Sequence, residues 1–395
     1  MAMPSPAAKN EAASSTQGER ASGSPRGIKA AIPRGGQIFL TIKPLPGESV
    51  PDLCRRLVRQ LHAQAAAPLH LLVYGNVRAG AATVDVLQKA SGHADWPLTW
   101  VEGADCDGGP IAGIQVHAFT GNVERIEFGG HVVGSVFTEG GARQCLVGGL
   151  VPADRTLSRP DQTRRALEDL QAILAQAGFA LADAVRTWLF LDDILSWYGD
   201  FNRARTEIYS GVKFHTGSHP ASTGVGAKNT AGTALAVGAW AMQPLNSSVR
   251  AEAIASPLQC PASAYGSSFS RAMELTSATG RRLLISGTAS IAPGGETLWP
   301  GDARRQVAQT MEVVEAILRS RGFGFSDLTR ATAYFKRRAD AQAFAEWHAA
   351  HGLRLQPAVM VRCDICRDDL VFELEADAWS HTARFVPFPL SAGRL

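Results

Sequence analysis

Apolar positions recur at the same spacing in two stretches of this chain, residues 162–193 and 306–337. In each stretch the apolar residues follow one helix face, a Gly-Phe pair stands where a helix C-cap belongs, and a β-rich run comes next. The two stretches align without a gap, at a constant offset of 144 residues from Gln162 to Gln306. A period this long indicates duplicated domains, since solenoid repeats are much shorter.

The flanking segments extend the repeat. The strand-like runs at 145–152 and 283–291 match, and 219–226 and 234–242 parallel 356–363 and 372–379. A fainter third copy comes first, with a helical pattern at 50–66 and β-rich runs at 69–75, 96–103 and 113–121. The sequence therefore predicts an α+β fold of tandem modules, with helices on one face of each sheet and a pseudo-threefold arrangement.

The boundaries follow from this repeat and from composition. Residues 1–35 are rich in Ala, Ser, Gly and Pro with almost no large apolar residue, which predicts a disordered tail. We expect a degenerate N-terminal module at 36–121, a middle module at 122–250 and a C-terminal module at 251–395.

Composition narrows the class of ligand. The chain has 395 residues, 45% hydrophobic and 19% charged, with a net charge of +3 and acids and bases scattered along it. This balance disfavours a nucleic-acid partner and favours a small molecule. No apolar run suggests a membrane span or signal peptide, and six dispersed cysteines do not indicate a disulfide framework. We expect a cytoplasmic protein with reduced thiols.

The segment VFELEADA at 371–378 carries the first chemical signal. A β-strand alternates faces, so Glu373 and Glu375 share one side while Phe372 and Leu374 occupy the other. Either the acidic side faces solvent, or its carboxylates perform chemistry.

The order of strand, helix, Gly-Phe, strand, Pro-Ala and acidic-apolar strand resembles the RidA/YjgF family, whose members are small trimers with sites between subunits. Its imine deaminases have an arginine after Pro-Ala, but Ser222 and Val359 stand there in this chain. The closing-strand glutamate of the family corresponds to Glu373, with Ala236 and Gln115 at the matching positions of the other modules. The resemblance therefore implies one active site and disfavours imine deamination.

Three further strings narrow the resemblance: Ser222-Thr223-Gly224, SGTASI at 286–291, and DICRDDL at 364–370 followed by FELEA. In this order they resemble the chorismatases, fused RidA-like proteins that release pyruvate from chorismate. The resemblance implies that Glu373 is a general acid that protonates the enolpyruvyl methylene carbon. Burial and a neighbouring carboxylate would both raise the pKa of Glu373 and keep it protonated near neutral pH. Glu375 is expected to be structural.

Chorismate carries two carboxylates, which require cationic or well-directed donors. The candidates are Arg271, Arg362, Arg367 and Lys228, with Arg271 and Arg367 favoured. Ser222, Thr223 and Gly224 are expected to bind the second carboxylate or the ring hydroxyl.

The outcome of the reaction is expected to depend on Ala289 and Cys363. Within the chorismatases, the residues near these two positions separate hydrolases from enzymes that form hydroxybenzoate, and Ala289 with Cys363 resembles the second kind. Cys363 and Cys366 form a C-x-x-C, but no further Cys or His motif completes a metal site. No metal and no cofactor are therefore expected.

The sequence thus predicts a monomeric chorismatase giving 3-hydroxybenzoate and pyruvate, with 4-hydroxybenzoate as an additional product left open. Three alternatives remain at this point: a chorismate hydrolase that forms a dihydroxycyclohexadiene carboxylate, a RidA-like imine deaminase, and a non-catalytic protein that binds a small acid.

Overall fold

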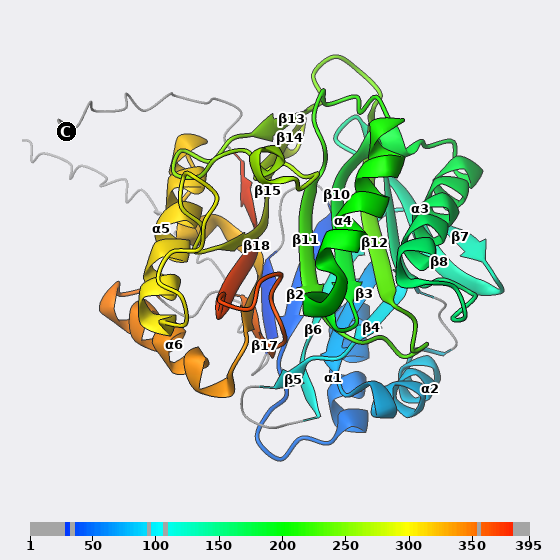
Figure 1. Cartoon of the computed structure of the whole chain (residues 1–395). Coiled ribbons are helices and arrows are strands. Elements are labelled where there is room, and N and C mark those ends of the chain that lie inside the picture. Colours follow the sequence, from blue (N-terminus) through cyan, green and yellow to red (C-terminus); the bar gives the residue numbers. More distant parts are fainter. Residues whose placement is uncertain (1–27, 32–35, 93–95, 106–109, 354–356, 382–395) are drawn as a thin grey trace, which may run out of the picture.

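Three mixed sheets, with helices on their outer faces, make up the protein (Figure 1). The structure is a computed structural model, and it describes residues 28–31, 36–92, 96–105, 110–353 and 357–381. The predicted α+β fold of tandem modules is confirmed.

The N-terminal sheet has the strand order β1-β2-β6-β3-β4. Its strands are β1 (Ile28–Ala31), β2 (Gln37–Ile42), β3 (Ala67–Gly75), β4 (Leu98–Val101) and β6 (Ile111–Phe119). Helices α1 (Val50–Ala63) and α2 (Gly80–Ser91) belong to this module, with the short 3₁₀ turn η1 (Val77–Ala79).

The middle sheet has the order β11-β10-β12-β9-β8-β7. Its strands are β7 (Glu124–Phe128), β8 (His131–Glu139), β9 (Ala142–Leu150), β10 (Ala184–Leu191), β11 (Ala221–Gly226) and β12 (Leu235–Pro244). Its helices are α3 (Arg159–Gln176), η2 (Leu181–Asp183) and α4 (Ile194–Ser210).

The C-terminal sheet has the order β13-β14-β15-β18-β16-β17-β5. Its strands are β13 (Arg250–Ile254), β14 (Ala272–Ser277), β15 (Gly280–Ala289), β16 (Leu328–Phe335), β17 (Ala358–Arg362), β18 (Phe372–Ser380) and β5 (Ala104–Asp105). Its helices are α5 (Ala303–Ser320), α6 (Ala341–Ala350), η3 (Ala262–Tyr265), η4 (Phe325–Asp327) and η5 (Arg338–Asp340).

The long helices begin and end where their sequences predict. Ser158 caps α3 and Asp302 caps α5, each accepting a hydrogen bond from a backbone N–H of the first turn. Gly178 and Gly322 follow the helix ends with φ of +70° and +73°, a backbone conformation that glycine adopts without strain. The Gly-Phe pairs therefore end both helices, and Phe179 and Phe323 enter the cores of their modules.

The pseudo-threefold relation is visible in the strand register. Tyr74, Phe190 and Tyr334 occupy corresponding positions on β3, β10 and β16, opposite the closing strand of each sheet. The ring centroid of Tyr74 lies 6.2 Å from that of Phe190 and 6.1 Å from that of Tyr334. The inner faces of the three sheets therefore meet in one aromatic cluster.

Two segments depart from the expected boundaries. Ile28–Ala31 form β1 and pair with β2, inside the predicted disordered tail, because Ile28 is buried in the N-terminal core. The rest of that predicted tail, residues 1–27 and 32–35, lies outside the described residues. β5 lies within the N-terminal module in sequence, between β4 and β6, but it pairs with β17 of the C-terminal sheet, so this strand crosses between modules.

Among the helices of the described ranges, none is both long and apolar enough to cross a membrane.

Candidate active site

A cavity of about 200 Å³ lies between the middle and C-terminal modules. The middle module contributes side chains from α4 and β11, and the C-terminal module contributes β15, β18 and the loops that follow β13 and β17. Strands β11 and β15 approach each other here: the backbone N–H of Ser222 donates to Ser286 Oγ at 2.9 Å, and that of Gly287 donates to Thr223 Oγ1 at 3.0 Å. The cavity is therefore an inter-module site.

Glu373 is the carboxyl group of this cavity. It lies on β18 opposite Ala289 of β15 and Tyr334 of β16, and only 4% of its surface is exposed. Burial, and secondly the negative charge of Glu375, raise the pKa of Glu373 to about 8. Its side chain is therefore a carboxylic acid at neutral pH, able to donate a proton.

Gly287 holds the backbone of β15 close to this carboxyl. A Cβ atom at Gly287 would collide with Oε1 of Glu373, and it would also crowd Cγ2 of Thr223 at 3.2 Å. Glycine is required here because the carboxyl group occupies the space of a side chain.

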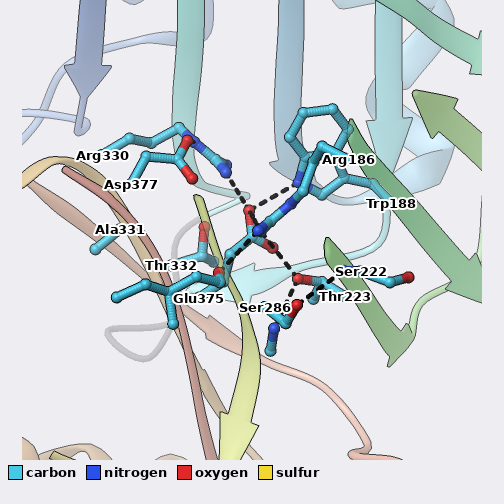
Figure 2. A network of polar contacts seen from close by, with 12 residues as sticks. Arg186, Trp188, Ser222, Thr223, Ser286, Arg330, Ala331, Thr332, Glu375 and Asp377 are labelled. Atoms are coloured by element: carbon cyan, nitrogen blue, oxygen red, sulfur yellow. Dashed lines mark hydrogen bonds and ion pairs between the residues drawn. The ribbon is translucent and has the colours of Figure 1, made fainter. Parts of the chain in front are cut away.

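Glu375 lies on the same side of β18 but serves another purpose (Figure 2). Its Oε1 accepts a hydrogen bond from Trp188 Nε1 at 2.7 Å, and forms ion pairs with Arg186 at 3.0 Å and with Arg330. These two guanidinium groups outweigh the burial and lower the pKa of Glu375 to about 2. Glu375 is therefore a fixed negative charge beside Glu373.

The acidic side of β18 thus faces the centre of the molecule, not solvent. Glu373, Glu375 and Asp377 are all buried there, and Arg330 also pairs with Asp377 Oδ2 at 2.8 Å. The opposite side of the strand, with Phe372 and Leu374, packs in the C-terminal core. The strand is buried on both faces because the other modules cover its polar one.

Three guanidinium groups line the cavity, from Arg205, Arg271 and Arg367. Arg271 donates through Nε and Nη2 to the carbonyl oxygen of Cys260, at 3.0 and 2.9 Å. Arg367 donates to the carbonyl oxygen of Gly295 at 2.8 Å. Backbone carbonyls thus position both cations without neutralising them, which leaves their charge available to an anionic ligand.

Arg205 on α4 completes the cationic set. It is 2% exposed, and its Nη2 donates to Asn202 Oδ1 at 2.7 Å. Its buried Nε has no hydrogen-bond partner among the described residues. A buried donor without a partner is costly, so a ligand that accepts from it would gain binding free energy.

The Ser222-Thr223-Gly224 run is divided between two sides of β11. Ser222 and Gly224 line the cavity, whereas Thr223 is not among its lining residues. Thr223 Oγ1 accepts from Arg186 at 3.2 Å and from the backbone N–H of Gly287 at 3.0 Å. Thr223 therefore connects the Glu375 ion-pair network to the strand that carries Gly287.

Several predicted residues lie elsewhere. Lys228, two residues after β11, and Arg362, the last residue of β17, are exposed and do not line the cavity. Cys363 packs against the central cluster of the three sheets, while Cys366, after the turn, lines the cavity. Burial and the charge of Glu373 raise the pKa of Cys366 to about 12, so its thiol remains protonated.

The assignment of Gln115 to the position of Glu373 is wrong. Tyr74 pairs with Gly113, as Phe190 pairs with Ala236 and Tyr334 with Glu373. Gly113 is thus the equivalent in the N-terminal module, and Gln115 corresponds to Glu375. The expectation that one module retains the carboxyl is unchanged.

Sequence reasoning missed the contribution of α4. Tyr198, Asn202 and Arg205 all line the cavity, and their spacing of four and three residues places them on one helix face. That spacing was present in the sequence as a signal. Tyr265 and Phe269 were also missed; they flank Arg271 with ring centroids at 5.4 and 5.5 Å from its guanidinium carbon.

Comparison with known proteins identifies the protein family. A family model described as endoribonuclease L-PSP matches residues 142–238 and 262–379, which together exceed half of the chain. The chain therefore belongs to this family, and the resemblance to RidA-type modules is confirmed.

Individual relatives give the finer likeness. The chain is 28% identical to a 3-hydroxybenzoate synthase of Streptomyces hygroscopicus over 242 residues, covering 54% of this chain and 68% of that protein. It is 31% identical to a RutC family protein of Pyrococcus horikoshii over 101 residues, covering 25% and 80% respectively. A crystal structure of a chorismatase superposes with a TM-score of 0.60 at 21% identity, covering 79% of this chain and 92% of that one. The three-module fold is thus that of a chorismatase.

Proposed function

We propose that this protein is a chorismatase that converts chorismate to 3-hydroxybenzoate and pyruvate. The observation that carries the proposal is the pairing, in one cavity, of a buried carboxylic acid, Glu373, with the guanidinium groups of Arg205, Arg271 and Arg367. The likeness to the Streptomyces 3-hydroxybenzoate synthase supports the same reaction.

The guanidinium groups that line the cavity are proposed to bind chorismate. Chorismate is a dianion, and guanidinium groups bind carboxylates through charge-assisted, often bidentate hydrogen bonds. The free Nε of Arg205 and the cavity-facing Ser222 supply further donors. Tyr265 and Phe269 surround Arg271 with apolar surface, which strengthens its interaction with an anion by excluding water.

The first chemical step is transfer of the Glu373 proton to the terminal methylene carbon of the enolpyruvyl group. Carbon is a weak base, so the acid must be neutral at working pH and close to the carbon, and burial of Glu373 provides the neutral form. The methylene carbon becomes a methyl group, the C=C double bond becomes a single bond, and an oxocarbenium ion forms at the ether carbon. The Glu373 carboxylate that remains stabilises this cation electrostatically.

The second stage breaks the ether and aromatises the ring. Chorismate and the sum of 3-hydroxybenzoate and pyruvate have the same atoms, so water added to the oxocarbenium carbon is balanced by dehydration of the ring. Ring aromatisation requires loss of a ring proton and of a hydroxyl group. No net oxidant or reductant enters the reaction.

We assign the role first expected of Cys363 to Cys366, because Cys366 lines the cavity and its thiol remains protonated. Next to Glu373, its S–H group can donate a hydrogen bond to the hydroxyl group that leaves the ring. Ala289, opposite Glu373 in the strand register, leaves room for the ring. These two residues are therefore proposed to favour the aromatic product.

The test is to incubate the purified protein with chorismate, follow pyruvate by a coupled assay and separate the ring products by chromatography. Pyruvate with 3-hydroxybenzoate supports the proposal, whereas pyruvate with a non-aromatic diol identifies a hydrolase and rejects the assignment of Cys366. Absence of pyruvate would reject chorismatase activity. A Cys363→Ser variant is the matched control for Cys366→Ser, and only the second should change the product ratio.

A further inference from the structure

A second cavity, of about 690 Å³, lies between the N-terminal and middle modules. Its walls come from β4, β9, α2, α3 and the β7–β8 hairpin. None of the residues of the candidate active site belongs to it. It is larger than the candidate active-site cavity.

The internal repeat relates the two cavities. Thr99 on β4 pairs opposite Leu72 as Thr223 on β11 pairs opposite Trp188, so the two threonines correspond. Thr99 Oγ1 accepts from the backbone N–H of Gly149 at 2.7 Å, as Thr223 Oγ1 accepts from that of Gly287 at 3.0 Å. The second cavity is therefore built on the same inter-module contact as the first.

The second interface lacks the residues that carry the proposed chemistry at the first. Leu98 occupies the position of Ser222, and Ala236 occupies that of Glu373. No arginine or lysine lines the second cavity among the described residues, whereas three arginines line the first. A dianion such as chorismate has no counter-charge at this place.

The lining indicates another ligand. Its floor is apolar, with Leu71, Leu87 and Leu150 buried and the aromatic rings of Trp96 and Phe128 partly exposed. Its charged side chains are acidic, Glu127 at the exposed rim and Asp169 buried on α3.

The ion-pair partner of Asp169 is an exposed arginine that a ligand cation can replace. Asp169 Oδ1 pairs with Arg165 Nη2 at 3.0 Å. The Asp169 side chain is only 6% exposed, whereas the Arg165 side chain is 56% exposed. An exposed arginine gains little from such a pair and can return to solvent. A ligand cation can then take its place on a carboxylate that is already desolvated.

We propose that the second cavity is a binding site for an aromatic amine. The aromatic ring lies on the apolar floor beside Trp96 and Phe128, and the ammonium group pairs with Asp169. Burial of the ring supplies affinity, and the acidic lining selects the cation against anions of the same shape.

The test uses calorimetry with two probes that share a ring and chain length, tryptamine as the cation and indole-3-propionate as the anion. Tryptamine should bind at one site, at least about tenfold more tightly than indole-3-propionate. Asp169→Asn should weaken tryptamine about tenfold. Glu168→Gln, an exposed neighbour on the same helix, is the matched control and should leave binding unchanged.

A second variant makes the result independent of the stability of Asp169→Asn. Ala153 is exposed at the rim of the cavity, so Ala153→Trp should fill the entrance without disturbing the core, and should abolish tryptamine binding. Excess chorismate should not displace tryptamine from wild type. Equal binding of the two probes, tryptamine affinity unaffected by Asp169→Asn and Ala153→Trp, or displacement by chorismate would each overturn the proposal.

Discussion

At the scale of single residues, two glutamates two positions apart have opposite protonation states. Glu373 and Glu375 are both buried on one side of β18, but only Glu375 contacts Arg186 and Arg330. Burial alone favours the neutral acid, whereas two adjacent cations favour the carboxylate. The same strand therefore presents a proton donor and a permanent negative charge, and the charge helps to keep the donor protonated.

The pH dependence of turnover follows from this arrangement. Glu373 must be protonated to act as the acid, and its pKa is about 8, so kcat should be constant near neutral pH and fall about tenfold per pH unit above about 8. Steady-state kinetics with chorismate across this range measures the profile. A rate that rises through pH 8 would contradict the assignment, because it would require Glu373 to act as a base.

The linkage to stability has a definite sign. The folded state raises the pKa of Glu373 above its ordinary value of 4.5, so the folded state binds the proton more tightly than the unfolded chain. The contribution of Glu373 to the stability of the folded state is therefore fully present below about pH 4.5, and it is lost as the pH rises through about 8.

Glu375→Gln tests the ion-pair network. The substitution leaves Arg186 and Arg330 without their shared carboxylate in a buried site, so the free energy of unfolding should fall by about 3 kcal/mol. Loss of the negative charge should also lower the pKa of Glu373 and move the alkaline limb of the kcat profile to lower pH. Urea denaturation and the pH profile measure the two effects.

Glu312→Gln is the control for this experiment, since Glu312 is an exposed glutamate on α5. It should change neither the free energy of unfolding nor the pH profile of kcat. Unaltered stability of Glu375→Gln would show that the network does not hold the modules together.

At the scale of elements, α4 provides one wall of the site and β18 the other. Arg205 on α4 is buried, and its Nε has no partner in the part of the chain that the structure describes. Arg205→Ala should therefore raise KM for chorismate about tenfold or more through loss of a charge-assisted contact. Arg203→Ala on the same helix is the matched control, because Arg203 is exposed and pairs with Asp200. Equal KM values for the two variants would exclude Arg205 from substrate binding.

The elements themselves were largely predictable, but the side chains near turns were not. Periodicity and the 144-residue offset identify α3 and α5, and alternation places Glu373 and Glu375 on one face. Sequence spacing could not show that the chain turns after β17, bringing Cys366 into the cavity and leaving Cys363 outside it. The correspondence of Gly113 with Glu373 depends on strand register, which residue spacing alone does not fix.

Sequence spacing likewise could not separate the four cation candidates. Arg271 and Arg367 line the cavity, whereas Lys228, two residues after β11, and Arg362, the last residue of β17, are exposed outside it. Spacing places Arg205 on one face of α4 with Tyr198 and Asn202, but only the packing of α4 against the C-terminal module, a long-range contact, shows that this face lines the cavity.

At the scale of the whole molecule, fusion of three modules makes the three interfaces different. A homotrimer must repeat every substitution at each interface, whereas a fused chain can keep Glu373 at one interface and replace it by Ala236 at another. One cavity can then specialise in anion chemistry while a second acquires an acidic, apolar lining.

The fused arrangement also predicts the assembly state. The module faces that meet in the central cluster of Tyr74, Phe190 and Tyr334 are already covered within one chain, so we expect a monomer. Light scattering coupled to size exclusion, over a range of concentrations, should give the mass of a single chain. A mass of two or three chains would contradict this expectation.

The central claim is that Glu373 is the proton donor for cleavage of chorismate. The most direct test compares wild type with Glu373→Gln, measuring pyruvate release and, by calorimetry, chorismate affinity. The amide keeps the shape of the side chain and cannot supply an acidic proton, so kcat should fall at least about a thousandfold while affinity stays within about threefold. Pyruvate release by Glu373→Gln at the wild-type rate would contradict the account.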